Sequence, residues 1–134
     1  MVLKSGDILR ERYKIKRFIS QGGMGSIFLA DDLRLEGRKC AVKDIHLDPS
    51  LPAETLKQTR EQFQREATVL ARLDHPNLPK VSDIFSEADS DYLVMDYIPG
   101  DDLLSLMIKN RQKNNFLDER MVLTWSNQLA VALA

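Results

Sequence analysis

The sequence has almost no cysteine and no excess of charge of either sign. Cys40 is its only cysteine, which excludes an internal disulfide and is typical of proteins from a reducing compartment. The 19 Lys and Arg residues meet 20 Asp and Glu residues, for a formal net charge of -1 at pH 7. This balance gives no electrostatic reason to expect a nucleic acid or an anionic membrane as a partner.

Long hydrophobic runs and metal-ligand patterns are also missing. No apolar run approaches the roughly 20 residues that span a bilayer, and the first fifteen residues hold no apolar signal-peptide core. We therefore expect a cytoplasmic protein with no membrane contact in this segment. Cys40, His46 and His75 lack the spacing of metal ligands, so we predict no structural zinc.

The composition and patterning that are present indicate a globular α+β domain. Hydrophobic residues make up 43% and charged residues 29% of the chain, and 134 residues are enough to bury a core. Apolar or alternating segments at 13–19, 26–30 and 39–45 predict three strands, whose short connections favour an antiparallel meander. Similar segments at 80–86 and 91–98 predict two more strands.

A long helix is predicted between the third and fourth of these strands. Ser50 is a candidate N-cap, Pro52 falls in the first turn, and Pro76 ends the helix. Apolar residues recur at helical spacing on one face, at Leu56, Phe63, Ala67, Leu70 and Leu73.

Two more helices are predicted after Gly100, over 101–110 and 118–134. The second has Asp118 as its N-cap and enough apolar residues to be mostly buried. The sequence ends inside this helix without a glycine cap, a basic last turn or a proline stop. We therefore expect the chain to be the front portion of a longer protein.

Gly22, Gly23 and Gly25 lie between the first two predicted strands and allow three interpretations. A hairpin turn uses glycine for positive φ, although two residues would suffice. A dinucleotide-binding turn needs a helix after it, whereas a strand follows here, and a Walker-type loop needs Gly-Lys-Ser/Thr, which is absent. The third interpretation is a lid of backbone N–H groups over phosphates, because bare glycines let the main chain approach an anion closely.

Two charged residues stand inside apolar patterns. Lys43 lies on the third predicted strand, where it could simply face solvent at period two. Glu66 follows Phe63 by three residues and precedes Leu70 by four, so it is predicted to lie on the apolar face of the long helix. Burial of either charge alone is costly, so we predict that the two form an ion pair that fixes the lysine where phosphates arrive. If Lys43 and Glu66 faced the same cleft but lay too far apart to pair, the arrangement would be an inactive one. The adjacent Asp31 and Asp32 are interpreted as solvated surface charge.

At these residues the sequence resembles the eukaryotic-type (Hanks-type) protein kinases, and most of all the bacterial serine/threonine kinases. The motifs stand in the family's order: ISQGGMGSIFLA at 19–30, CAVK at 40–43, REATVLARLDHPNL at 65–78 and YLVMDYIPGDDL at 92–103. The resemblance implies an α+β, protein-kinase-like N-lobe over 1–98, with a five-stranded antiparallel sheet and one long C-helix. Residues 99–134 would be the hinge end and the first helices of a truncated C-lobe.

The resemblance implies that ATP lies under the glycine-rich loop. That loop would comprise Ile19, Ser20, Gln21, Gly22, Gly23, Met24, Gly25, Ser26 and Ile27. Lys43 would contact the α- and β-phosphates, and Glu66 would hold it. Ser20 replaces the first glycine of the family's G-x-G-x-x-G, so we expect a less flexible entry to the loop.

The resemblance also assigns contacts for the nucleoside. Ala41 would pack against adenine, and Met95 would be the gatekeeper at the back of the pocket, although both are also ordinary core residues. The backbone groups of Asp96 and Ile98 would bind the adenine edge. Asp102 would reach the ribose hydroxyls, or cap the helix that follows it, or do both.

The family's catalytic-loop HRD, its asparagine and its DFG, which supply the base and the Mg²⁺ ligands, do not occur up to Ala134. The resemblance thus implies the ATP-binding portion of a kinase that transfers the γ-phosphate to protein Ser/Thr, using ATP and Mg²⁺, with a protein substrate. We predict that this fragment alone is inactive. A pseudokinase module that binds nucleotide or protein, and a structural domain without a ligand, remain alternatives.

We also expect a homodimer or swapped arrangement through the C-terminal helices. The family's larger lobe would cover the apolar residues of the last helix, and large uncovered apolar patches promote association. Those residues are Val122, Leu123, Trp125, Leu129, Val131 and Leu133.

Overall fold

The computed structural model describes residues 2–22 and 25–134, so the loop predictions for Gly23 and Met24 lie outside the described residues. The chain divides into two compact units. The sheet unit comprises Met1–Asp74 and Pro79–Tyr97, and the helical unit comprises His75–Leu78 and Ile98–Ala134.

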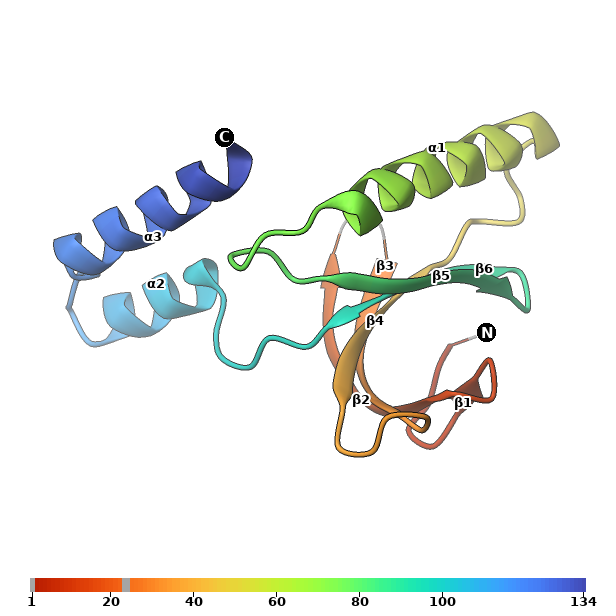
Figure 1. The fold of residues 1–134 in the computed structure, drawn as a ribbon, viewed down its shortest axis with the longest axis horizontal. Helices are drawn as coiled ribbons and strands as arrows, with labels where there is room; N and C mark the ends of the chain where they lie inside the picture. Colours follow the sequence, from red (N-terminus) through yellow and green to blue (C-terminus); the bar gives the residue numbers. More distant parts are fainter. Residues whose placement is uncertain (1, 23–24) are drawn as a thin grey trace. The chain divides into compact units, whose positions relative to one another are not determined.

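An antiparallel sheet with the order β1-β2-β3-β4-β6-β5 builds the sheet unit (Figure 1). The strands are β1 (Ile8–Leu9), β2 (Tyr13–Gly22), β3 (Gly25–Asp32), β4 (Lys39–Ile45), β5 (Val81–Glu87) and β6 (Ser90–Asp96). The predicted α+β class with an antiparallel sheet and one long helix is confirmed, but the described sheet has six strands and not five. The additional strand, β1, is only two residues long, and such a segment is too short to show a strand period.

The two faces of the sheet carry separate apolar clusters. On one face, Tyr13, Ile15, Val42 and Val94 are almost fully buried together with residues from the N-terminal segment. On the other face, a second cluster joins the sheet to the long helix through Ile45, Phe63, Ala67, Val81 and Leu93. Side chains alternate between the faces of a strand, so neighbours on β4 belong to different clusters.

Helix α1 (Ala53–Arg72) packs along the β5 side of the sheet (Figure 1). Its N-cap is Pro52, so the prediction of Ser50 as the N-cap is wrong. The backbone N–H of Ser50 donates to Asp48 Oδ1 at 2.9 Å, which closes the preceding turn before the helix begins. The helix ends at Arg72, and an extended Leu73 follows it ahead of Pro76.

The buried stripe of α1 is narrower than its sequence predicts. Phe63 and Ala67 are its buried residues, whereas Leu70 and Leu73 are 45% and 44% exposed. The C-terminal turn of the helix therefore contributes little to the core of the sheet unit.

The helical unit contains α2 (Leu103–Gln112) and α3 (Glu119–Leu133). Both predicted N-caps are confirmed: Asp102 Oδ1 accepts from the N–H of Ser105 at 2.7 Å, and Asp118 Oδ1 accepts from the N–H of Arg120 at 2.8 Å. The prediction that the last helix is mostly buried is wrong, because no residue of α3 is buried. None of the described helices is long and apolar enough to cross a bilayer.

Candidate functional site

Lys43 lies on the face of β4 that α1 covers. Its cross-strand partners are Ile27 on β3 and Leu93 on β6. Alternation along the strand puts Lys43 on the same face as Ile45, which packs in the cluster with Phe63 of α1. The side chain is half-buried, so Lys43 does not simply face open solvent.

The residues predicted to contact adenine share this face. Ala41 lies opposite Leu29 on one side and Met95 on the other, and it is 8% exposed. Met95 is partly buried and packs against the α1-side cluster. The sheet thus brings Ala41, Lys43 and Met95 together on one surface, where apolar side chains lie beside one ammonium group.

The glycine segment forms the end of the β2–β3 hairpin, where Gly22 pairs with Gly25. Gly25 has a φ of +150°, and a Cβ at this position would stand 2.0 Å from the carbonyl oxygen of Asp44. Only glycine allows β3 to approach the β4 backbone this closely beside Lys43. A Cβ on Gly22, in contrast, would make only an ordinary 4.0 Å contact.

The other described loop residues flank this hairpin end. Ser20 and Gln21 are exposed, while Ile19, Ser26 and Ile27 are half-buried. Their strand pairing matches the hairpin interpretation, and the close approach at Gly25 leaves backbone next to the Lys43 surface.

Glu66 does not lie on the buried face of α1. Its side chain is exposed, and its Oε1 accepts a hydrogen bond from Gln62 Nε2 at 2.9 Å. Within the described residues, no nitrogen–oxygen distance of 4.0 Å or less joins Lys43 to Glu66. A step of three residues turns a helix short of a full circle by about 60°, which puts Glu66 beside the narrow stripe of Phe63 and Ala67.

Asp96 ends β6 and is held through both its backbone and its side chain. Its N–H donates to the carbonyl of Lys80 at 3.0 Å, and its Oδ2 accepts from the N–H of Lys80 at 3.0 Å. Since the N–H is engaged, the backbone group that Asp96 can offer to a ligand is its carbonyl oxygen.

Ile98 and Asp102 belong to the helical unit, where Ile98 is 65% exposed. The hydrogen bond from the Ser105 N–H lowers the pKa of the Asp102 carboxyl. Asp102 therefore acts as the N-cap of α2. His75 fastens its loop as well, because its Nδ1 accepts from the N–H of Asn77 at 3.0 Å.

A buried carboxylate at the end of β3 was not predicted from the sequence. The Asp32 side chain is 0% exposed and accepts two hydrogen bonds of 2.9 Å from Arg12 and one of 2.8 Å from Arg38. The hydrogen bonds from Arg12 are the main reason that the pKa of Asp32 lies well below its usual range. The interpretation of Asp32 as solvated charge is wrong. The period of two from the buried Phe28 through Ala30 to Asp32 was the signal that could have found it.

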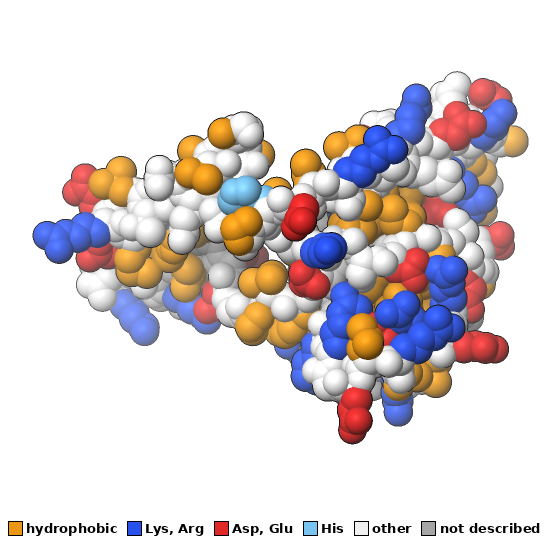
Figure 2. Space-filling view, in the orientation of Figure 1, with side chains coloured by type: hydrophobic (Ala, Val, Ile, Leu, Met, Phe, Trp, Pro, Cys, Tyr) orange, Lys and Arg blue, Asp and Glu red, His pale blue; other side chains and the backbone are white. Residues whose placement is uncertain are grey.

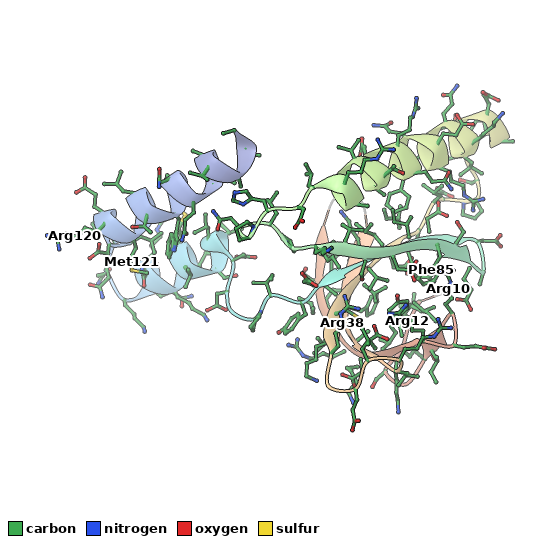
Figure 3. The ribbon with its side chains drawn as sticks, in the orientation of Figure 1. Arg10, Arg12, Arg38, Phe85, Arg120 and Met121 are labelled. Carbon is green, nitrogen blue, oxygen red and sulfur yellow. The ribbon has the colours of Figure 1, made fainter. Side chains whose placement is uncertain are left out.

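The network extends from Asp32 across the sheet. Arg38 Nη2 donates to Ser82 Oγ on β5 at 3.0 Å and lies 3.6 Å from Asp96 Oδ1 at the end of β6. Figure 3 places Arg12 and Arg38 side by side below β5, and Figure 2 shows Lys and Arg side chains gathered there. Arg38 therefore links β3 and β5 to Asp96 on β6, the residue predicted to meet adenine.

Asp44, next to Lys43 in sequence, points to the opposite face of the sheet. It is 6% exposed, and its Oδ1 has no hydrogen-bond partner within the described chain. Burial raises the pKa of this carboxyl. Among the same described residues, no group of three or more His, Cys, Asp or Glu side chains is arranged to hold a metal ion.

Comparison with protein families gives a match to the protein kinase domain over residues 13–134. Serine/threonine-protein kinase C of Synechocystis is 41% identical over 113 residues, which are 81% of this chain and 20% of that protein. PrkC of Bacillus subtilis, also a serine/threonine-protein kinase, is 37% identical over 95 residues, which are 71% of this chain and 14% of that protein.

Among solved structures, the kinase domain of Mycobacterium tuberculosis PknI superposes with a TM-score of 0.78 at 29% identity. The match covers 98% of this chain and 49% of that domain. The chain thus spans about half of this solved kinase domain and a fifth or less of the two bacterial relatives.

Proposed function

Because the chain belongs to the protein kinase family, we propose that it is the ATP-binding portion of a serine/threonine kinase that transfers the γ-phosphate of ATP to proteins. The observation that carries the proposal is the shared surface of β4 and β6. It combines the apolar Ala41 and Met95 with the half-buried Lys43, next to a close backbone approach that only a glycine at position 25 permits.

Each part of this surface has a chemical task in the proposal. Ala41 and Met95 cover the apolar faces of adenine, and the carbonyl of Asp96 accepts a hydrogen bond from its amino group. Lys43 neutralises phosphate charge, and backbone N–H groups near Gly25 contact phosphate oxygens. Mg²⁺ bound with ATP supplies further charge neutralisation, and its protein ligands are not expected in this chain.

The chain by itself is proposed to transfer no phosphate. Its 134 residues contain neither His-Arg-Asp nor Asp-Phe-Gly, the triplets that hold the base and a metal ligand in the family. Glu66 is exposed and forms no ion pair with Lys43 among the described residues, so the pair that would fix the lysine is missing. A pseudokinase module is the second candidate, and the lack of a Lys43–Glu66 ion pair in the described part of the chain is the observation that favours it.

The binding proposal is tested by NMR titration of the chain with Mg-ATP, a method suited to weak affinity. We expect saturable shifts in β4 and β6, and a loss of about tenfold or more in affinity for Lys43→Met. Lys39→Met is the matched control, because Lys39 lies on the same strand but is exposed and pairs with Asp31 at 3.2 Å. Equal affinity of the Lys43→Met variant and the wild type would contradict the role of Lys43.

The inactivity proposal needs a separate assay. The purified chain is incubated with labelled Mg-ATP and a generic protein substrate, and no transfer above background is expected. Transfer that disappears in Lys43→Met would overturn this part. A longer form of the protein that binds Mg-ATP but phosphorylates nothing would favour the pseudokinase candidate.

We further propose that the apolar surface of the helical unit associates with a second copy of the chain. A groove of about 620 Å³ is lined by apolar residues of α2 and the following loop, among them Leu104, Met107, Ile108 and Phe116. Phe116 is 97% exposed. Sedimentation over a range of concentrations tests this proposal, and a monomer at every concentration would refute it.

A further inference from the structure

Arg38 occupies a central position between the buried carboxylate and the end of β6. Its guanidinium donates to Asp32 Oδ2 at 2.8 Å and to Ser82 Oγ at 3.0 Å, and it lies 3.6 Å from Asp96 Oδ1. The Arg38 side chain is 23% exposed (Figure 3), while the carboxylates that it meets are fully buried at Asp32 and 46% exposed at Asp96.

Asp32 fixes the direction of the Arg38 guanidinium. The carboxylate is fully buried and takes two further hydrogen bonds from Arg12, with a third donor in the N–H of Arg34 at 3.1 Å. A planar guanidinium held at one end presents its remaining N–H groups in a fixed geometry. The guanidinium of Arg38 is therefore held by Asp32 in a fixed orientation where it faces Asp96.

Asp96 is held on its other side by Lys80. The N–H of Lys80 donates to the carboxylate, and the carbonyl of Lys80 accepts the N–H of Asp96, both at 3.0 Å. The carboxylate is thus placed between a backbone donor and a fixed cation. Both contacts restrict the backbone of Asp96 and the direction of its carbonyl.

We propose that Arg38 is a positioning residue for nucleobase recognition, acting through Asp96 to aim the carbonyl oxygen that accepts the adenine amino group. This inference rests on the proposed ATP binding and adds a residue outside the nucleotide surface itself. Arg38 touches no atom of the ligand. Its effect passes through the last residue of β6.

Nucleobase selectivity distinguishes this role from a structural one. Adenine carries an amino donor where guanine carries a carbonyl acceptor, so a fixed carbonyl on the protein favours adenine and repels guanine. A site built to pair with one polar group discriminates strongly only while that group is held in place. Loss of Arg38 lets the Asp96 carbonyl move, which weakens ATP binding and relaxes the rejection of GTP.

The experiment measures dissociation constants for Mg-ATP and Mg-GTP by NMR titration of the whole chain. For Arg38→Ala we expect the ratio of GTP to ATP dissociation constants to fall about five- to tenfold. Arg34→Ala is the matched control, because Arg34 lies on the same β3–β4 loop with an exposed side chain. Its ratio is expected to stay at the wild-type value.

A second variant removes the contact and leaves the anchor intact. Asp96→Asn keeps an oxygen for the Lys80 N–H and leaves Asp32 with both arginines, but it removes the charge that faces Arg38. The ratio is expected to fall in the same direction by about two- to threefold. This variant decides the question if Arg38→Ala does not fold.

The outcomes separate the two proposals. A wild-type chain that binds neither nucleotide overturns the proposed function, and the role of Arg38 with it. A wild-type chain that prefers ATP, with an unchanged ratio in Asp96→Asn and in folded Arg38→Ala, overturns the positioning role alone. Equal weakening of ATP and GTP, with a lower midpoint of thermal unfolding, would make Arg38 merely structural.

Discussion

The sheet unit and the helical unit both carry many apolar residues, but they differ in how many of them they bury. Every buried side chain that the structure describes belongs to the sheet unit, and most of the buried apolar ones form two clusters on opposite faces of the sheet. In the helical unit, α2 and α3 bury none of their residues.

The difference shows what local signals can and cannot achieve. Asp102 and Asp118 cap their helices with short hydrogen bonds. The helical unit therefore has well-formed helix N-termini although it has no buried core. Short helices in water are marginal without tertiary packing.

The sheet unit should therefore unfold at a higher urea concentration than the helical unit. The only tryptophan, Trp125, lies in α3 and reports on the helical unit, while amide exchange in β4 reports on the sheet unit.

The largest expected effect comes from Phe63→Ala. Phe63 is 6% exposed and links α1 to the sheet, so its truncation should cost the sheet unit about 4 kcal/mol through lost burial and a cavity. Amide exchange in β4 measures the loss. Slow β4 exchange at the wild-type level would mean that α1 contributes nothing to the core.

A smaller effect is expected for Asp32→Asn, which leaves two arginines facing a neutral amide. We expect a loss of about 2 kcal/mol at pH 7, less than for a fully buried ion pair because both arginines keep some contact with water. Urea unfolding followed by far-UV circular dichroism measures it. The control is Asp31→Asn, whose carboxylate is one-third exposed and binds two surface lysines.

The same carboxyl gives a pH dependence with a definite sign. The pKa of Asp32 is lower in the folded state than the value of about 3.9 in the unfolded chain. Its stabilisation is therefore complete above about pH 4 and is lost as pH falls toward the folded pKa. The wild type should lose stability in this acid range more steeply than Asp32→Asn. Parallel pH profiles would argue against the buried pair.

Asp44→Asn is expected to stabilise the sheet unit by about 1 kcal/mol at pH 7. The folded pKa of Asp44 is raised by burial, so stability from this group is present at low pH and is lost as pH rises through the folded pKa. The gain in the variant should shrink as pH falls. Asp74→Asn, at an exposed position, should show no such gain.

The smallest effect is expected in α3. Leu129 is 56% exposed, so Leu129→Ala in dilute protein should change the stability of the helical unit by less than about 0.5 kcal/mol. The urea transition of Trp125 fluorescence measures it. A large loss that appears only at high protein concentration would instead support burial of α3 by a second copy.

Elements with a local signal were predicted well. Strand β4 has its predicted bounds, because the apolar residues Cys40 to Val42 and Ile45 lie in one short segment between the turn at Gly37 and a polar loop. The caps at Asp102 and Asp118 depend on side chains that bind backbone a few residues away. The strand and the two caps can therefore be predicted without knowing which distant residues they contact.

Long-range pairing was not predictable in the same way. Asp32 meets Arg12, twenty residues away in sequence, only after β2 and β3 pair in a register that places Asp32 opposite Tyr13. Neither residue lies in a local sequence pattern that predicts this partner. Glu66 was predicted to lie on the buried face of α1 but lies beside it, because the sheet beneath the helix decides which face is buried. The assignments of Ala41 and Met95 as adenine contacts stay predictions.

The outermost strand of the sheet has one further consequence. Along β5, Arg10 pairs with Asp83 at 2.7 Å, its N–H reaches Glu87 at 2.8 Å, and Arg38 reaches Ser82. An open strand rim is a template on which another chain can add a strand and begin aggregation. Here two bulky cations, Arg10 and Arg38, are bound to side chains of that strand, so an approaching strand would meet them. The resistance of this sheet to strand addition would then depend on these two arginines.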